Sequence, residues 1–291
     1  MKKIIFLLLL STKLFAQLPN TDIWLLDIKA GKDTIILSNP VNITNRVGYD
    51  NQPAFSPDGN SILYTSIRDE KQSDIYTYNI KTKTTTQFTN TPTTSEYSPN
   101  FTPDGTAISV VMVEPDSTQR LWEFPLKGGA PKLVMDKVDS IGYYCWLDNT
   151  HAALFLITIP FKFIITDITT QESTAPIRDT VGRSFRLVKT KGEKKLFYSS
   201  YRGIYSLNLA GKKETKCETI KKFEGEDFCF IEPQKIIMGD GPKLYLNWFG
   251  LSGDDGKFDW NELTDLSKYG IKKITRIAIS PDGRKMAIVA E

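Results

Sequence analysis

The stretch QPAFSPDG at residues 52–59, followed by ILYTS at 62–66, decides the fold of this protein. Proline presets φ at the second position of a four-residue turn, aspartate is tolerated at the third, and glycine takes the fourth, where φ is often positive. A turn of this kind between two apolar strands predicts a β-hairpin.

Two further stretches repeat this order. SPNFTPDG at 98–105 leads into ISVV at 108–111, and IAISPDG at 277–283 leads into MAIV at 286–289. The shared turn residues are Pro57, Asp58, Gly59, Pro103, Asp104, Gly105, Pro281, Asp282 and Gly283. One such turn predicts only a hairpin, whereas matching turns with matching strands indicate an internal repeat.

Weaker copies lie between the second and the last of these stretches. Hairpins are expected at 145–157, 185–198 and 228–238. A strand rich in aromatic and branched residues follows each unit's hairpin, as at 74–80. The equivalent turn positions are Gly59, Gly105, Thr150, Gly192, Gln234 and Gly283, with steps of 46, 45, 42, 42 and 49 residues. This period, with four strands per unit, predicts the blades of a β-propeller.

The two ends of the chain complete the count of blades. The last hairpin, at 274–290, has no third or fourth strand after it, and residues 22–28 and 34–37 supply such strands. We therefore predict an all-β, six-bladed propeller of four-stranded antiparallel blades, closed by pairing of the N-terminal strands with the C-terminal hairpin. This closure leaves no unpaired blade edge at the join.

The first residues have the order of a secretory signal peptide. Lys2 and Lys3 precede the apolar run at 4–10, and residues 11–16 lead into Gln17. The run is shorter than the roughly 20 residues that span a membrane. We predict a signal peptide at 1–16, cleaved after Ala16, and a single propeller domain at 17–291. The protein is then periplasmic or secreted, with no transmembrane segment after cleavage.

The charge balance argues against nucleic-acid binding, and the cysteine content argues against a disulfide framework. Cleavage removes three of the 37 basic residues and none of the 34 acidic ones, so the mature protein is nearly neutral and no nucleic-acid partner is expected. Cys145, Cys217 and Cys229 are odd in number and form no C-x-x-C pair. We expect buried, inert thiols rather than a disulfide framework.

The turns, with Asp-Ile-Tyr strands such as the one at 74–76 between them, resemble the TolB-like repeat, a WD40-like repeat. The resemblance covers nearly the whole mature chain and is strongest in blades one, two and six. It implies a propeller in the cell envelope or outside the cell. TolB and the prolyl-oligopeptidase-type peptidases have additional domains, and we expect no equivalent of these domains in this chain. No G-x-S-x-G motif occurs in the sequence. The repeat therefore predicts fold rather than function.

Catalytic, metal and cofactor sites are not expected. A nucleophilic triad needs a histidine beside Ser or Cys and a carboxylate, and we interpret His151, the single histidine, as a solvated turn residue. The acidic loop of Asp254, Asp255 and Asp259 lacks the order of a calcium loop and is interpreted as a polar connection in blade five. The aromatic residues beside this loop form an exposed patch or pack between blades: Trp248, Phe249, Phe258 and Trp260.

Alignment on the turns places a set of side chains at the mouth of the central channel. One layer is Gln52, Ser98, Tyr143, Phe185, Asp227 and Arg276, and the layer two residues earlier includes Asp50, Glu96 and Arg183. Such a mixture can orient a peptide or small ligand. The alternative is that these groups only cap the channel with paired charges and water.

These observations favour a monomeric, non-catalytic binding or scaffold propeller that recognises a protein or peptide partner in the cell envelope. One alternative is a small hydrolase or lyase acting on peptide or carbohydrate at the central channel. Another is a structural propeller that works only beside a separately encoded partner.

Overall fold

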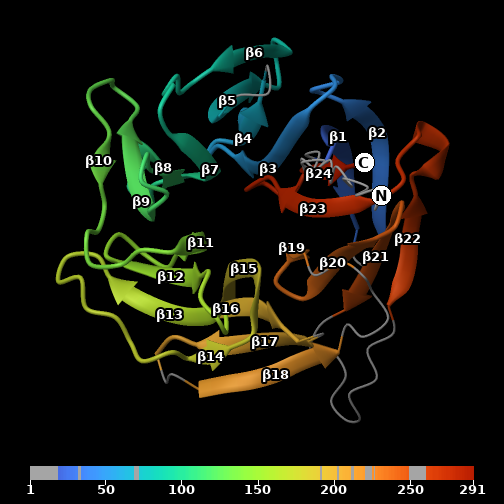
Figure 1. The fold of residues 1–291 in the computed structure, drawn as a ribbon. Helices are drawn as coiled ribbons and strands as arrows, with labels where there is room; N and C mark the ends of the chain where they lie inside the picture. Colours follow the sequence, from blue (N-terminus) through green and yellow to red (C-terminus); the bar gives the residue numbers. More distant parts are fainter. Residues whose placement is uncertain are drawn as a thin grey trace, which may run out of the picture.

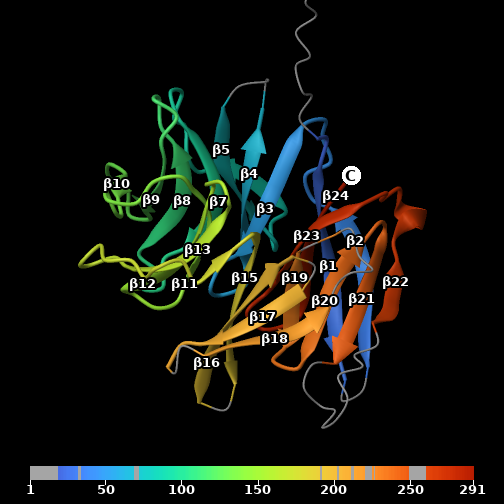
Figure 2. The ribbon, with the colours of Figure 1, turned by 60° about the horizontal axis from the view of Figure 1, so that its bottom comes forward.

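The computed structural model describes residues 19–31, 34–68, 72–190, 192–201, 203–210, 213–219, 225, 227–248 and 260–291. Six four-stranded antiparallel sheets form a ring (Figure 1), which Figure 2 shows from a second direction. The predicted signal peptide and the acidic loop at 254–259 lie outside the described residues. No helix in the described ranges is long and apolar enough to cross a membrane.

In each blade the first strand named is the innermost and the last is the outermost (Figure 1). Blade one is β3 (Tyr49–Phe55), β4 (Ser61–Ile67), β5 (Ser73–Asn79) and β6 (Thr84–Gln87). Blade two is β7 (Ser95–Phe101), β8 (Ala107–Val113), β9 (Gln119–Pro125) and β10 (Lys132–Leu133). Blade three is β11 (Ile141–Trp146), β12 (His151–Leu156), β13 (Lys162–Asp167) and β14 (Arg178–Asp179).

Blade four is β15 (Val181–Thr190), β16 (Glu193–Ser200), β17 (Gly203–Asn208) and β18 (Lys213–Thr219). Blade five is β19 (Phe228–Glu232), β20 (Lys235–Asp240), β21 (Lys243–Trp248) and β22 (Asn261–Asp265), followed by a 3-10 turn at Ser267–Tyr269. Blade six is β23 (Ile274–Ile279), β24 (Lys285–Ala290), β1 (Asp22–Ala30) and β2 (Ile35–Asn42). The predicted six-bladed arrangement is confirmed.

The closure of blade six joins the two ends of the chain. Strand β1 pairs with β24 from Asp22↔Ala290 to Asp27↔Lys285, and β2 pairs with β1. The pairing buries Ile23 completely, and Lys285 Nζ donates a hydrogen bond to Asp27. The predicted pairing of the N-terminal strands with the C-terminal hairpin is confirmed.

The core lies between the blades. One apolar cluster joins blades two and three and includes Val111, Leu121, Leu154 and Ile164. Similar clusters join the other neighbours, because both faces of each sheet pack on an adjacent blade. This packing explains why the second strands are continuously apolar rather than alternating.

The turn that fixes the repeat has the same hydrogen bonds in its three clear copies. The Ser56 hydroxyl donates to Asp58 Oδ1 at 2.6 Å and accepts from the Ser61 amide at 2.9 Å. Gly59 has φ of 71°, a conformation that glycine adopts without steric cost. The copies at 102–107 and 280–285 repeat these bonds. The turns lie at one end of the ring, which we call the turn end.

At the opposite end, the chain passes from each blade to the next and from each second strand to the third. We call this the connector end. It includes the connector 43–48 and the loop 157–161. The innermost strand of each blade begins at the connector end. The third residue of β11, β15 and β23 therefore lies nearer to the connector end.

The three cysteines are free. Cys229 is buried, and Cys145 and Cys217 are partly buried. Burial raises the pKa of the Cys145 thiol to about 11, so this sulfur is protonated at neutral pH and is a poor nucleophile.

Candidate binding site in the central channel

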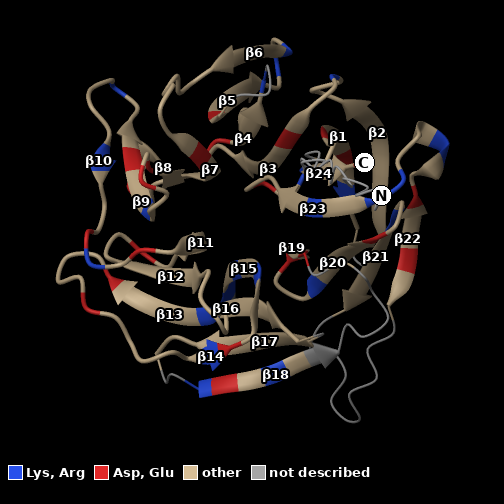
Figure 3. Ribbon diagram, viewed as in Figure 1, with Lys and Arg blue, Asp and Glu red and all other residues tan. Residues whose placement is uncertain are grey.

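The innermost strands of all six blades surround a central cavity of about 420 Å³. This volume lies in the range of small-molecule and peptide sites. Six of the eight predicted ligand-binding residues line it: Gln52, Tyr143, Arg183, Phe185, Asp227 and Arg276. Basic residues on β15 and β23 border the centre of the ring in Figure 3.

Bulges shape the inner strands where they meet this cavity. The register of β3 shifts between Asn51 and Ala54, and that of β7 shifts between Tyr97 and Asn100. Strands β11, β15 and β23 carry comparable shifts near their connector ends. A bulge re-aims side chains, which lets adjacent residues of one strand face the cavity.

Arg276 is held at the cavity by neutral groups. Its Nε donates to Asn51 Oδ1 at 2.9 Å, and its Nη2 donates to the Tyr143 hydroxyl at 2.9 Å. The guanidinium carbon lies 5.0 Å from the centre of the Tyr143 ring. No carboxylate in the described part of the chain forms an ion pair with Arg276.

Asp227 connects three blades. Its Oδ1 accepts hydrogen bonds from the Ser184 hydroxyl at 2.8 Å and from Arg186 Nη2 at 3.2 Å, and its Oδ2 accepts from the Ile277 amide at 2.8 Å. Burial alone would lower the pKa of Arg186, but the adjacent Asp227 carboxylate raises it above its usual range. Asp227 thus accepts three hydrogen bonds, one of them in an ion pair with Arg186, and has little capacity left for a ligand.

Gln52 and Ser98 both adopt positive φ, 57° and 53°, which is uncommon outside glycine. Gln52 Oε1 accepts from the Ser98 amide at 2.7 Å and from the Thr65 hydroxyl at 2.9 Å, so it links blades one and two. The Ser98 hydroxyl is buried beside the cavity and has no hydrogen-bond partner among the described residues. This hydroxyl can bond to a ligand or to water.

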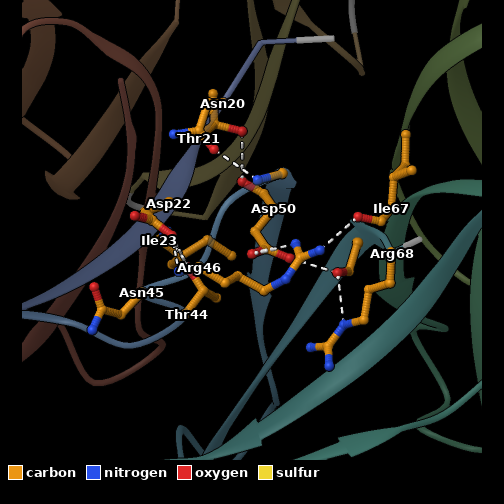
Figure 4. A network of polar contacts seen from close by, with 12 residues as sticks. Asn20, Thr21, Asp22, Ile23, Thr44, Asn45, Arg46, Asp50, Ile67 and Arg68 are labelled. Atoms are coloured by element: carbon orange, nitrogen blue, oxygen red, sulfur yellow. Dashed lines mark hydrogen bonds and ion pairs between the residues drawn. The ribbon is translucent and has the colours of Figure 1, made fainter. Parts of the chain in front are cut away.

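Asp50 does not line the cavity. Its buried carboxylate accepts from the Ser66 hydroxyl at 2.6 Å and from Arg46 Nη1 at 3.0 Å (Figure 4). Arg46 also donates to the Ile67 carbonyl at 2.9 Å. Burial raises the pKa of Asp50, while the bonds from Ser66 and Arg46 oppose that rise. Asp50 thus anchors the connector between blades six and one.

Glu96 also lies outside the cavity lining. Its fully buried carboxylate accepts from the hydroxyls of Thr89, Thr91 and Thr94 at 3.1, 2.6 and 2.7 Å. Burial raises the pKa of Glu96, the three hydroxyls lower it, and the nearby Asp74 carboxylate raises it further. Glu96 ties blade two to the connector that follows blade one.

Sequence reasoning missed three residues that belong to this site. Asn51 holds Arg276, and Arg186 neutralises Asp227. Tyr49 lies near Arg276, Tyr143 and Tyr97, and burial raises its pKa to about 12. Asn51 is next to Gln52 in the sequence and Arg186 is next to Phe185. This adjacency to predicted site residues is the sequence signal that could have identified them.

The other candidate features lie away from the cavity. His151 Nδ1 is 3.1 Å from Asp148 Oδ1, and His151 Nε2 is 3.7 Å from Asp167 Oδ2, on the turn-end side of blade three. Trp260 is buried, and the half-buried Trp248 has Lys235 Nζ 4.6 Å from its ring centre. Phe249 and Phe258 lie outside the described residues. Within the described ranges, no three His, Cys, Asp or Glu side chains are grouped to hold a metal ion.

Comparison with known proteins identifies the fold. No protein-family model and no curated protein matches the sequence. TolB from Acinetobacter baumannii is 12% identical with a TM-score of 0.57, over 93% of this chain and 64% of that one. A putative TolB from Agrobacterium tumefaciens is 15% identical with a TM-score of 0.62, over 93% and 98%. An oligogalacturonate lyase in complex with manganese is 13% identical with a TM-score of 0.51, over 92% and 78%.

These likenesses show that the chain has the fold of a TolB-like six-bladed β-propeller. The chain spans less than two thirds of the length of the Acinetobacter baumannii TolB. Because a lyase shares the architecture, the fold alone leaves the function open.

Proposed function

We propose that this protein is an exported, non-catalytic binding propeller that recognises a protein or peptide partner in the cell envelope at its central channel. The observation that carries the proposal is the cavity itself, which combines aromatic rings with the guanidinium of Arg276. Tyrosine and arginine are the side chains that most often dominate the binding energy of protein interfaces.

The connector end supports this proposal by its apolar surface. Most of the large apolar side chains exposed in the described structure lie there: Val47, Ile157, Ile159, Phe161, Tyr201 and Tyr269. The others are Leu126 at the turn end and Ile36 and Val41 on the outer strand β2. Exposed apolar groups gathered at one face are typical of protein interaction sites. The cavity lining also includes Phe55, Trp146 and Pro281 at the turn end, and the exposed apolar groups are the observation that favours approach of the partner from the connector end.

The chemistry of the cavity favours binding over catalysis. General acid–base catalysis needs a group with a free proton-transfer position near the reacting atoms. Asp227 is the carboxylate among the described lining residues, and three hydrogen bonds engage it. His151 lies outside the lining.

Export rests on the sequence at 1–16 and on the TolB-like fold. Mass spectrometry of the protein from its native host tests this part directly. A mature chain that begins at Gln17 supports export, and a chain that retains Lys2 and Lys3 in a cytoplasmic fraction contradicts it.

Partner capture tests the binding function. The tagged mature protein is incubated with solubilised envelope, and stoichiometric partners are identified for wild type, Arg276→Glu and Arg284→Glu. We expect wild type and Arg284→Glu to capture the same partner, because Arg284 lies at the turn end. We expect Arg276→Glu to lose this partner. A tightly bound metal together with turnover of a peptide or glycan would instead support the enzyme alternative.

A further inference from the structure

Arg276 differs from four other half-buried arginines in the groups that it contacts. Arg46, Arg120, Arg178 and Arg186 each have a carboxylate within 3.2 Å. Arg276 instead bonds to an amide oxygen and a phenol, and neither partner carries a compensating charge. Partly burying a cation without a counter-ion is unfavourable, and a guanidinium has further N–H groups suited to a carboxylate.

Packed aromatic rings connect this cation to an exposed loop through the buried Phe155. The Tyr143 ring that Arg276 contacts lies 5.6 Å from the Phe155 ring, and Phe155 lies 5.1 Å from Phe161. Phe161 belongs to the loop 157–161, in which Ile159 is fully exposed. A row of aromatic contacts thus leads from the cavity to an exposed apolar loop at the connector end.

The position of this loop depends on a glycine. A Cβ at Gly142, the residue before Tyr143, would lie 2.7 Å from Ile157 Cγ1, closer than real contacts allow. The lack of a side chain lets Ile157 lie directly on β11, next to Tyr143, which lines the cavity. Ile157, which is 47% exposed, therefore lies beside the strand that carries the half-buried Tyr143, so the surface at this point presents both the loop and the ring that contacts Arg276.

We propose that this surface binds a peptide segment that places a carboxylate on Arg276 and an adjacent apolar side chain on the loop 157–161. The inference rests on the proposed function and specifies its ligand. The carboxylate belongs to an acidic side chain or to the free C-terminus of the partner, since both present the same planar pair of oxygens. Charge complementarity at Arg276 and the exposed apolar loop together define this ligand class.

Defined peptide pools test the proposal. Short random-sequence peptides are made with and without Asp and Glu, each with a free or an amidated C-terminus, which gives four pools. The immobilised mature protein is exposed to each pool, and retained peptides are quantified by mass spectrometry. We expect wild type to retain the three carboxylate-containing pools about tenfold better than the carboxylate-free pool, a difference of roughly 1.4 kcal/mol.

Two variants and two controls locate the site. Arg276→Gln should abolish the preference for carboxylates, and Arg276→Lys should keep part of it because the charge remains. Ile159→Ser should remove the enrichment of apolar residues next to the carboxylate. Arg284→Gln and Leu126→Ser make the same chemical changes at the turn end and should leave retention unchanged. Thermal unfolding establishes that each variant is folded.

The outcomes separate the inference from the function on which it rests. Equal retention of all four pools by wild type would overturn the carboxylate site while leaving peptide binding intact. Retention of no pool would overturn peptide binding in the channel as well. Two outcomes would support the proposal and identify the carboxylate. Enrichment confined to amidated peptides with Asp or Glu would show that Arg276 binds a side-chain carboxylate. Enrichment confined to peptides with a free C-terminus and no Asp or Glu would show that it binds the terminal carboxylate.

Discussion

Replacing Asp227 by asparagine should destabilise the ring more than breaking other ion pairs of similar length. The substitution leaves Arg186 without its counter-ion and replaces an oxygen that accepts from Ser184 or Ile277 by a donor. Breaking a buried pair by removing one partner typically costs about 3–5 kcal/mol. The Asp227 side chain is 7% exposed but Arg186 is 29% exposed, so we expect the lower end, about 3 kcal/mol.

This value is large beside the total stability of a domain, about 5–15 kcal/mol. Urea unfolding followed by tryptophan fluorescence measures it. The matched control is Glu214→Gln, which breaks an ion pair of 2.5 Å to Arg178 whose side chains are 29% and 26% exposed. That control should cost about 1 kcal/mol or less, because solvent screens the pair.

A double-mutant cycle tests the physical cause. If the unpaired Arg186 guanidinium produces most of the loss, Arg186→Gln should restore part of the stability of Asp227→Asn, and the two losses will not add. A loss below about 1 kcal/mol for Asp227→Asn, or one equal to that of Glu214→Gln, would refute the view that Asp227 joins blades four, five and six.

Three further predictions concern stability and the binding surface. Burial raises the pKa of Glu96, so the folded state retains its proton at a higher pH than the unfolded chain, and the stability from Glu96 falls as pH rises through the folded pKa. Glu96→Gln should therefore gain urea stability relative to wild type as the pH rises above 4.5, the usual pKa of Glu, and parallel pH profiles would contradict this. Ile23→Ala should cost about 3 kcal/mol in urea unfolding because Ile23 is fully buried in the closing strand, whereas exposed Ile36→Ala should cost less than about 0.5 kcal/mol. Gly142→Ala must displace Ile157 and should weaken peptide retention severalfold, and unchanged retention would separate the loop from the site.

The fold could be predicted from the sequence because the information is local and repeated. A turn such as the one at Pro57 to Gly59 specifies its hairpin through φ and hydrogen bonds within a few residues. The closure could also be predicted. The C-terminal hairpin lacks outer strands, and the two N-terminal strands lack a hairpin, so pairing them completes one four-stranded blade. Degenerate turns in the middle blades keep the same spacing, so the period remained visible.

The site could be predicted only in part, and the bulges explain why. In a regular strand, Asp50 and Gln52 would face the same side, two residues apart. The irregularity after Asn51, with Gln52 at positive φ, breaks that alternation. Asp50 therefore enters the interior of blade one, and Glu96 does the equivalent before the bulge of β7. No periodic pattern in the sequence marks such a bulge.

TolB proteins and an oligogalacturonate lyase in complex with manganese are similar to this chain in fold, so the fold alone leaves its function open. In this chain the acidic groups near the channel are used inside the protein. Asp50, Glu96 and Asp227 each accept at least two hydrogen bonds that link blades or connectors. Arg276 is the opposite case, since its charge is held in place by neutral groups and is not compensated by them. A channel with its carboxylates engaged and one arginine charge uncompensated is suited to bind an anion rather than to transfer a proton, which is why the binding hypothesis is preferred here to the enzymatic one.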